Sequence, residues 1–104
     1  MIKLSTIIPI YNKEKALRNT LQSIVDNHEI PDDEYECILI DDESTDSCPN
    51  ICKEFCQKYS YFKYFRIFND GLHWPSNARN IGLDIAKGTF VHFLDADDLL
   101  LKTF

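Results

Sequence analysis

Strand-like runs alternate with helical stretches along the whole chain, and this alternation limits the fold more than any other feature. Four short runs are apolar and rich in β-branched or aromatic residues, as buried strands are. They lie at residues 4–10, 36–40, 64–68 and 89–94. Three stretches carry apolar residues at helical spacing: residues 14–27, a stretch that ends at residue 59, and a stretch that ends at Gly88. The second has N-cap candidates at residues 44–47, and the third has one at Ser76. Because this order requires crossover connections, we predict a three-layer α/β/α fold, Rossmann-like, with a mostly parallel sheet.

Size, charge and cysteine content narrow the class of protein. A chain of 104 residues is one domain with room for a core. Its net charge of −6 makes it a poor binder of phosphate backbones, so we expect no nucleic-acid partner. We also expect no transmembrane segment and no signal peptide, because the apolar runs are short and the first begins at Leu4. The four cysteines lack the spacing of a secreted scaffold, which predicts a cytoplasmic protein; association with the inner face of the membrane stays open.

Polar and acidic side chains follow three of the four expected strands. They are Tyr11-Asn12 after the first strand, Asp41-Asp42 after the second and Asp95-Ala96-Asp97 after the fourth. In parallel sheets, ligands bind outside the carboxyl ends of the strands. The sequence therefore predicts a binding site at this edge of the sheet.

The Asp-x-Asp formed by Asp95 and Asp97 is a candidate metal site. A strand that ends in alternating carboxylates brings together the oxygen ligands that Mg²⁺ and Mn²⁺ prefer. These ions take one or two carboxylates and complete their shell with waters and substrate phosphates. The alternative is that Asp97 or Asp98 caps a helix that begins at Leu99. We favour the metal site because of its place after a strand.

Two other positions at this edge have both a functional and a structural interpretation. Asp41-Asp42 either accepts a hydrogen bond from a nucleobase N–H or a ribose hydroxyl, or forms a solvated acidic turn. Arg79 lies in the expected first turn of a helix, where a cation opposes the helix dipole. It therefore needs an anion nearby, which is either a bound phosphate or a carboxylate such as Asp70 or Asp95.

Cys48, Cys52 and Cys56 recur every four residues, a spacing that resembles a metal site. The apolar residues between them complete one stripe of a helix, and free cysteine packs as a small hydrophobic residue. The chain has no Cys-x-x-Cys pair, and its three histidines show no ligand spacing. We therefore predict that these cysteines belong to the core and bind no zinc.

Four blocks of sequence stand in an order that is characteristic of one enzyme family. They are Ser5-Thr6-Ile7-Ile8-Pro9-Ile10-Tyr11-Asn12, Asp41-Asp42-Glu43-Ser44-Thr45-Asp46, Asn69-x-Gly71 with Ala78-Arg79-Asn80-x-Gly82, and Phe93-Leu94-Asp95-Ala96-Asp97-Asp98. Together they resemble family 2 glycosyltransferases of the GT-A fold. Glu43 departs from the family, which usually has a small residue there, and the segment between Gly71 and Ala78 is a few residues longer than is common.

The resemblance implies that residues 1–104 are the N-terminal, nucleotide-diphospho-sugar-binding half of a GT-A domain. The residues that it implies are Pro9, Tyr11, Asn12, Asp42 and Arg79 for the nucleotide, and Asp95 and Asp97 for Mn²⁺ or Mg²⁺. The implied reaction moves a sugar from a nucleotide-diphosphate sugar, UDP-linked, to a hydroxyl of a saccharide or lipid-linked acceptor, as in polysaccharide biosynthesis. The acceptor site and the catalytic base would lie outside these residues, so we expect the 104 residues alone to be inactive.

Two other functions are compatible with the same motifs. In a phosphotransferase or phosphatase, Asp95 would be the nucleophile and Asp97 the acid/base, but such enzymes place Asp-x-Asp after the first strand of the core. In a receiver-type signalling domain, Asp41-Asp42 would hold Mg²⁺. That domain also needs an aspartate after the third strand, and Asn69-Asp70 is only a partial match.

Overall fold

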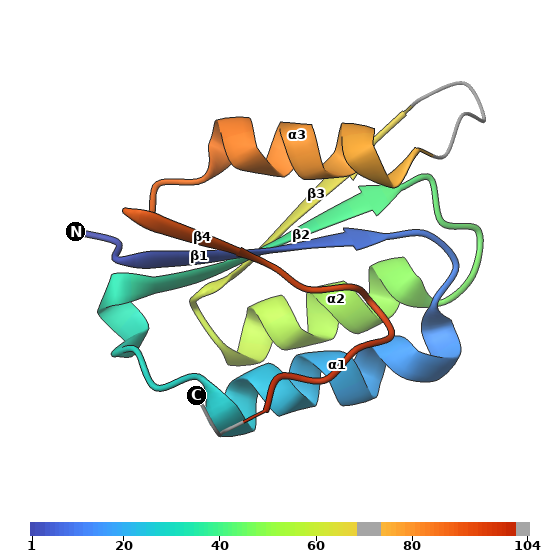
Figure 1. Cartoon of the computed structure of the whole chain (residues 1–104). Coiled ribbons are helices and arrows are strands. Elements are labelled where there is room, and N and C mark those ends of the chain that lie inside the picture. Colours follow the sequence, from blue (N-terminus) through green and yellow to red (C-terminus); the bar gives the residue numbers. More distant parts are fainter. Residues whose placement is uncertain (69–73, 102–104) are drawn as a thin grey trace.

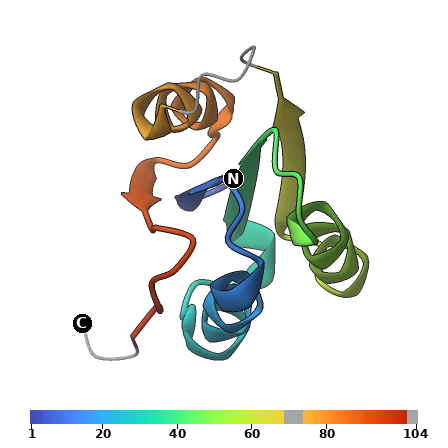
Figure 2. The ribbon, with the colours of Figure 1, turned by 90° about the vertical axis from the view of Figure 1, so that its right-hand side faces the viewer.

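The computed structural model describes residues 1–68 and 74–101. The strands in these residues are β1 (Leu4–Ile10), β2 (Tyr35–Asp42), β3 (Phe62–Ile67) and β4 (Phe90–Phe93). The helices are α1 (Glu14–Asn27), α2 (Cys48–Lys58) and α3 (Pro75–Ile85), with one 3₁₀ turn at Asp32–Glu34. The sheet lies between α3 on one face and α1 and α2 on the other (Figures 1 and 2). The predicted three-layer α/β architecture is confirmed.

All strand pairs in the described sheet are parallel, and the strand order is β3-β2-β1-β4. The central strand β1 pairs with β2 over its whole length, from Leu4 opposite Tyr35 to Ile10 opposite Asp41. It pairs with β4 on its other side only from Leu4 to Ile7. Because the strands are parallel, the segments that follow β1, β2 and β4 leave the sheet at the same edge. None of the described helices is long and apolar enough to cross a bilayer.

Two apolar clusters hold the layers together, one on each face of the sheet. Alternate residues of β1 point to opposite faces, so Ile8 joins the cluster under α1 and α2 while Ile7 joins the cluster under α3. Both side chains are fully buried. Gly82 of α3 lies directly against Ile7: a Cβ at that position would be 2.5 Å from the Ile7 Cγ2 atom. A side chain at residue 82 would therefore push α3 away from the sheet.

The cysteines lie in the core, as predicted. Cys37, Cys48 and Cys52 are fully buried, Cys56 is partly buried, and none is in a disulfide. Burial raises the pKa of the Cys48 thiol to about 12 and raises the pKa of Cys52 and Cys37 as well. The cysteine stripe of α2 is thus the apolar face that the helix presents to the sheet.

Some element ends differ from those that the sequence predicts. β2 continues through Asp42, and β3 begins at Phe62, because these residues still pair across the sheet. α3 begins at Pro75 with Trp74 as its N-cap, so Ser76 is not the cap. Proline suits this first position because its missing N–H would have no helical partner there. The residues after Asp98 that the structure describes, 99–101, form no helix, so the capping interpretation of Asp97 and Asp98 is wrong.

A buried carboxylate fixes the opposite, amino edge of the sheet. Glu36 of β2 is 1% exposed and accepts hydrogen bonds from Ser5 Oγ at 2.6 Å, Lys87 N at 2.7 Å and Lys63 Nζ at 3.0 Å. Burial alone would raise the pKa of Glu36, but these hydrogen bonds and the Lys63 charge hold it below its usual value. Gly88 donates to Ser5 Oγ at 2.8 Å and does not end α3, which stops at Ile85.

Candidate functional site

A cavity of about 440 Å³ opens at the carboxyl edge of the sheet. It is lined by most of the residues that the sequence predicts for a site, namely Pro9, Tyr11, Asp42, Arg79, Asp95 and Asp97. Asn12 does not line it, whereas Ile10, Lys13 and Ala96 do. Residues separated by most of the chain length therefore meet in one concave surface.

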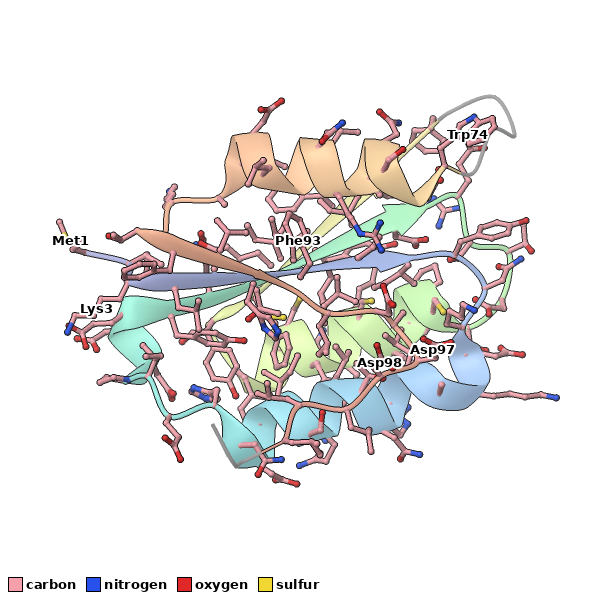
Figure 3. All side chains as sticks on the ribbon, in the orientation of Figure 1. Met1, Lys3, Trp74, Phe93, Asp97 and Asp98 are labelled. Atoms are coloured by element: carbon pink, nitrogen blue, oxygen red, sulfur yellow. The ribbon has the colours of Figure 1, made fainter. Side chains whose placement is uncertain are left out.

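Three carboxylates gather on the segment that follows β4. Asp95, Asp97 and Asp98 are exposed, and each offers one oxygen atom within 4.8 Å of the others. Figure 3 shows Asp97 and Asp98 on this segment, beside the start of α1. The segment is held against α1 because Thr20 Oγ1 donates to the carbonyl of Ala96 at 2.9 Å. A set of oxygen donors at this spacing fits a hard cation such as Mn²⁺ or Mg²⁺.

Two cations already face these carboxylates. Arg79 Nη2 lies 3.1 Å from Asp95 Oδ1, so a carboxylate supplies the anion that Arg79 needs. Lys13 Nζ lies 3.7 Å from Asp97 Oδ2. All four side chains are at least 40% exposed, and ion pairs of this kind add little to stability because water screens them. The pairs are therefore easily exchanged for other partners.

Asp41 has a structural role in the turn that follows β2. Asp41 is fully buried, and its carboxylate accepts hydrogen bonds from the Tyr64 hydroxyl, from Arg66 Nη1 at 2.9 Å and from the backbone N–H of Ser44 at 3.0 Å. Burial and the hydrogen bond to Asp41 both raise the pKa of Tyr64. Asp42 lines the cavity instead. Asp41 thus holds the turn, and Asp42 lies at the cavity.

Asn12 connects the loop after β1 to the turn after β2. Its backbone N–H donates to Ser44 Oγ at 3.0 Å, and its side-chain Oδ1 accepts from the N–H of Thr45 at 2.8 Å. Asn12 has a φ of +50° and Glu43 a φ of +58°, in the left-handed region that asparagine tolerates better than most residues. The hydrogen bonds of Asn12 therefore join the loop that carries Tyr11 to the turn that follows Asp42.

Sequence reasoning missed Lys13, Tyr64 and Arg66. Lys13 carries the same signal that singled out Arg79, since it is a cation at the start of a helix and so needs an anion nearby. Arg66 and Tyr64 carry no local signal, because they reach Asp41 only through the pairing of β3 with β2.

Sequence comparisons point to one family of enzymes. The glycosyl transferase family 2 pattern matches residues 5–104. The minor teichoic acid biosynthesis protein GgaB of Bacillus subtilis is 42% identical over 97 residues, which make up 92% of this chain and 10% of GgaB. The similarity thus covers nearly all of this chain and a small part of that relative.

Solved structures share the fold. S. aureus TarS 1–349 in complex with UDP-GlcNAc matches with a TM-score of 0.87 and 35% identity, over 97% of this chain and 28% of that one. The mannosyltransferase PcManGT from Pyrobaculum calidifontis, in complex with GDP-Man and Mn²⁺, matches with a TM-score of 0.80 and 25% identity, over 93% of this chain and 28% of that one. This chain, which spans under a third of either structure, belongs to glycosyl transferase family 2 and has the α/β fold of the GT-A glycosyltransferases.

Proposed function

We propose that these residues bind the donor and the metal in a glycosyltransferase that moves a sugar from a UDP-linked donor to an acceptor hydroxyl. The observation that carries the proposal is the single cavity shared by Tyr11, Asp42, Arg79 and the Asp95–Asp97 pair. The TarS structure with UDP-GlcNAc supports the choice of UDP, and the PcManGT structure with Mn²⁺ supports a divalent cation.

Each residue that the resemblance implies for the nucleotide has a part in this proposal. The Tyr11 ring, 40% exposed, offers a flat face on which uracil stacks beside Pro9. Asp42 accepts a hydrogen bond from the base, which selects a base with an N–H at that edge. Arg79, which lines the same cavity, would lie on the nucleotide side. Asn12 acts indirectly, by fixing the turn that carries Asp42.

Asp95 and Asp97 would hold Mn²⁺ or Mg²⁺. When bound, such an ion acts as a Lewis acid toward the charge that develops on the leaving diphosphate. The carboxylates would otherwise repel the diphosphate, so metal and nucleotide should strengthen each other's binding by the same factor. We propose that the general base for the acceptor comes from outside residues 1–104.

The proposal also covers the location of the protein, the class of acceptor and the two alternative functions. A cytoplasmic location suits four free cysteines, which a reducing compartment keeps as thiols. The relation to GgaB, whose name refers to teichoic acid biosynthesis, supports a role in polymer assembly, with a saccharide or lipid-linked sugar as acceptor. The receiver alternative is not favoured, because hydrogen-bond donors already occupy both oxygens of Asp41. The phosphatase alternative is not favoured either, because its Asp-x-Asp would follow the first strand and not β4.

A melting series tests the proposal. The chain is unfolded by heat with UDP, with Mn²⁺, with both and with neither. Ligand at ten times its dissociation constant stabilises a protein by about 1.4 kcal/mol. For a domain of this size, that is a rise in melting temperature of roughly 5–10 °C. We expect the two ligands together to shift the midpoint by more than the sum of their separate shifts.

A matched pair of variants assigns the nucleotide site. Asp42→Ala should weaken binding of uridine, with or without metal, whereas Asp33→Ala, in the exposed 3₁₀ turn before β2, should leave binding unchanged. An additive melting series, or equal behaviour of the two variants, would show that the cavity is not the donor site.

A further inference from the structure

Lys13 is a cation that lines the candidate site, and hydrogen bonds of its main chain fix its position. It is the N-cap residue of α1, and its carbonyl accepts from the N–H groups of Ala16 at 3.1 Å and Leu17 at 2.8 Å. Its own N–H donates to Cys48 Sγ at 3.2 Å. The main chain at Lys13 is therefore fixed, and its side chain lines the same cavity as Asp42 and Arg79.

The ammonium group of Lys13 stands where the helix dipole disfavours a cation. The Asp46 carboxylate caps this end of α1 by accepting from the N–H of Glu14 at 3.1 Å, and the Lys13 ammonium group itself pairs with Asp97 at 3.7 Å. The Lys13 and Asp97 side chains are 47% and 54% exposed, so their attraction is weak. An anion of higher charge inside the cavity would attract the ammonium group more strongly than Asp97 does.

We propose that Lys13 is an exchangeable counter-ion of the donor site. In the absence of donor it pairs with Asp97; once a divalent cation takes that carboxylate, Lys13 turns to a phosphate oxygen of the nucleotide. This inference rests on the proposed function, since the ligand is a nucleoside diphosphate. Lys13 therefore competes with the metal for Asp97 but supports the diphosphate, so its removal should change the two affinities in opposite directions.

The test measures both affinities in the whole chain by NMR, following the amide signals of residues 95–98. Mg²⁺ is titrated alone, and UDP is titrated at saturating Mg²⁺. We expect Lys13→Met to bind Mg²⁺ about threefold more tightly than the wild type does. A change in affinity of this size is what the loss of the weak, exposed Lys13–Asp97 pair predicts. It should bind UDP about tenfold more weakly, as loss of one charge-assisted hydrogen bond predicts.

Two control variants separate this role from general effects. Lys53→Met removes the same charge from α2, outside the residues that line the cavity, and should change neither affinity. Lys13→Arg keeps the cation and should restore both affinities toward those of the wild type. A Lys13→Met change that matches Lys53→Met, or that lowers both affinities together, would overturn the inference.

The same data distinguish failure of the inference from failure of the proposed function. If the wild-type chain binds Mg²⁺ and UDP cooperatively but Lys13→Met behaves like the wild type, only the inference is wrong. If the wild-type chain binds neither Mg²⁺ nor UDP at millimolar concentration, both the inference and the proposed function are wrong.

Discussion

Arg66 of β3 stands directly opposite Asp41 of β2 in the sheet and donates to its carboxylate at 2.9 Å. Its second guanidinium nitrogen donates to the carbonyl of Ser44 at 3.0 Å. One side chain thus pairs with a fully buried carboxylate and anchors the turn that follows it. The position of Asp42 at the cavity therefore depends on a residue from the neighbouring strand.

Arg66→Met should destabilise the fold by about 2–3 kcal/mol, because it removes the cation and one of the three hydrogen-bond donors of the buried Asp41 carboxylate. For a domain of this size, that lowers the melting temperature by roughly 10–20 °C. Urea unfolding measures the change. The control is Arg18→Met, which breaks an exposed ion pair with Glu54 and should cost less than about 1 kcal/mol. Equal losses in the two variants would contradict a special role for the Asp41 pair.

Asp97→Asn should abolish the dependence of UDP binding on Mn²⁺ without unfolding the chain. The Asp97 side chain is 54% exposed, so its replacement disturbs no packing. Loss of a charged ligand should weaken Mn²⁺ binding by about tenfold or more, or about 1.4 kcal/mol. Calorimetric titration with Mn²⁺ measures this. Asp98→Asn is the matched control, because Asp98 belongs to the same cluster but does not line the cavity, and its effect on UDP should be smaller.

Glu36→Gln should destabilise the chain at pH 7, and the difference from the wild type should shrink as the pH falls. Hydrogen bonds hold the pKa of Glu36 in the folded state below its usual value. At a pH near the usual pKa, the unfolded chain therefore binds more protons than the folded chain does. Its contribution is therefore present above the unfolded pKa and is lost as the pH falls through the folded pKa. Urea unfolding between pH 7 and about pH 3 measures this contribution. Its loss should begin as the pH falls below the ordinary glutamate pKa of about 4.3. As a control, Glu29→Gln replaces an exposed side chain and should leave the stability at pH 7 close to that of the wild type.

The thiols should react slowly with an aromatic disulfide reagent in the native state and together on unfolding. Burial raises the pKa of Cys48 to about 12, so few native thiolates form at neutral pH. The raised pKa values also predict a loss of stability as the pH rises above the ordinary thiol pKa of about 8.5, since the unfolded chain then releases protons first. Cys56, which is partly buried, should react first. Stoichiometric zinc in the purified chain would show that the packing interpretation is wrong.

The residues 1–104 alone should bind donor and metal without transferring sugar, because the proposed base lies outside them. The measurement is a sugar-transfer assay of the purified chain with UDP-GlcNAc and simple saccharide acceptors. Turnover above the rate in buffer would contradict this placement of the base. A control with Asp42→Ala would then show whether the turnover depends on the cavity.

The sequence predicts the fold well where the signal is local. The bounds of β1 and α1 follow from a run of apolar residues and from helical spacing, and both agree with the structure. The alternation of strands and helices also places Asp42 and Asp95 at one edge, because parallel strands share a direction. What could not be predicted depends on register. Arg66 meets Asp41 only through the pairing of β2 with β3. Asn12, which has a left-handed backbone, accepts a hydrogen bond from Thr45 and does not line the cavity.

The short pairing of β4 with β1 has a consequence for how the site assembles. β4 contributes only four paired positions at the margin of the sheet, yet the segment just beyond it carries both Asp95 and Asp97. Strand margins open locally more often than central strands do. Each opening of β4 would separate the two aspartates from Asp42. A ligand that contacts both the aspartates and Asp42 would therefore hold β4 in its paired position. Donor binding should therefore slow amide exchange in β4 far more than in the central strand β1.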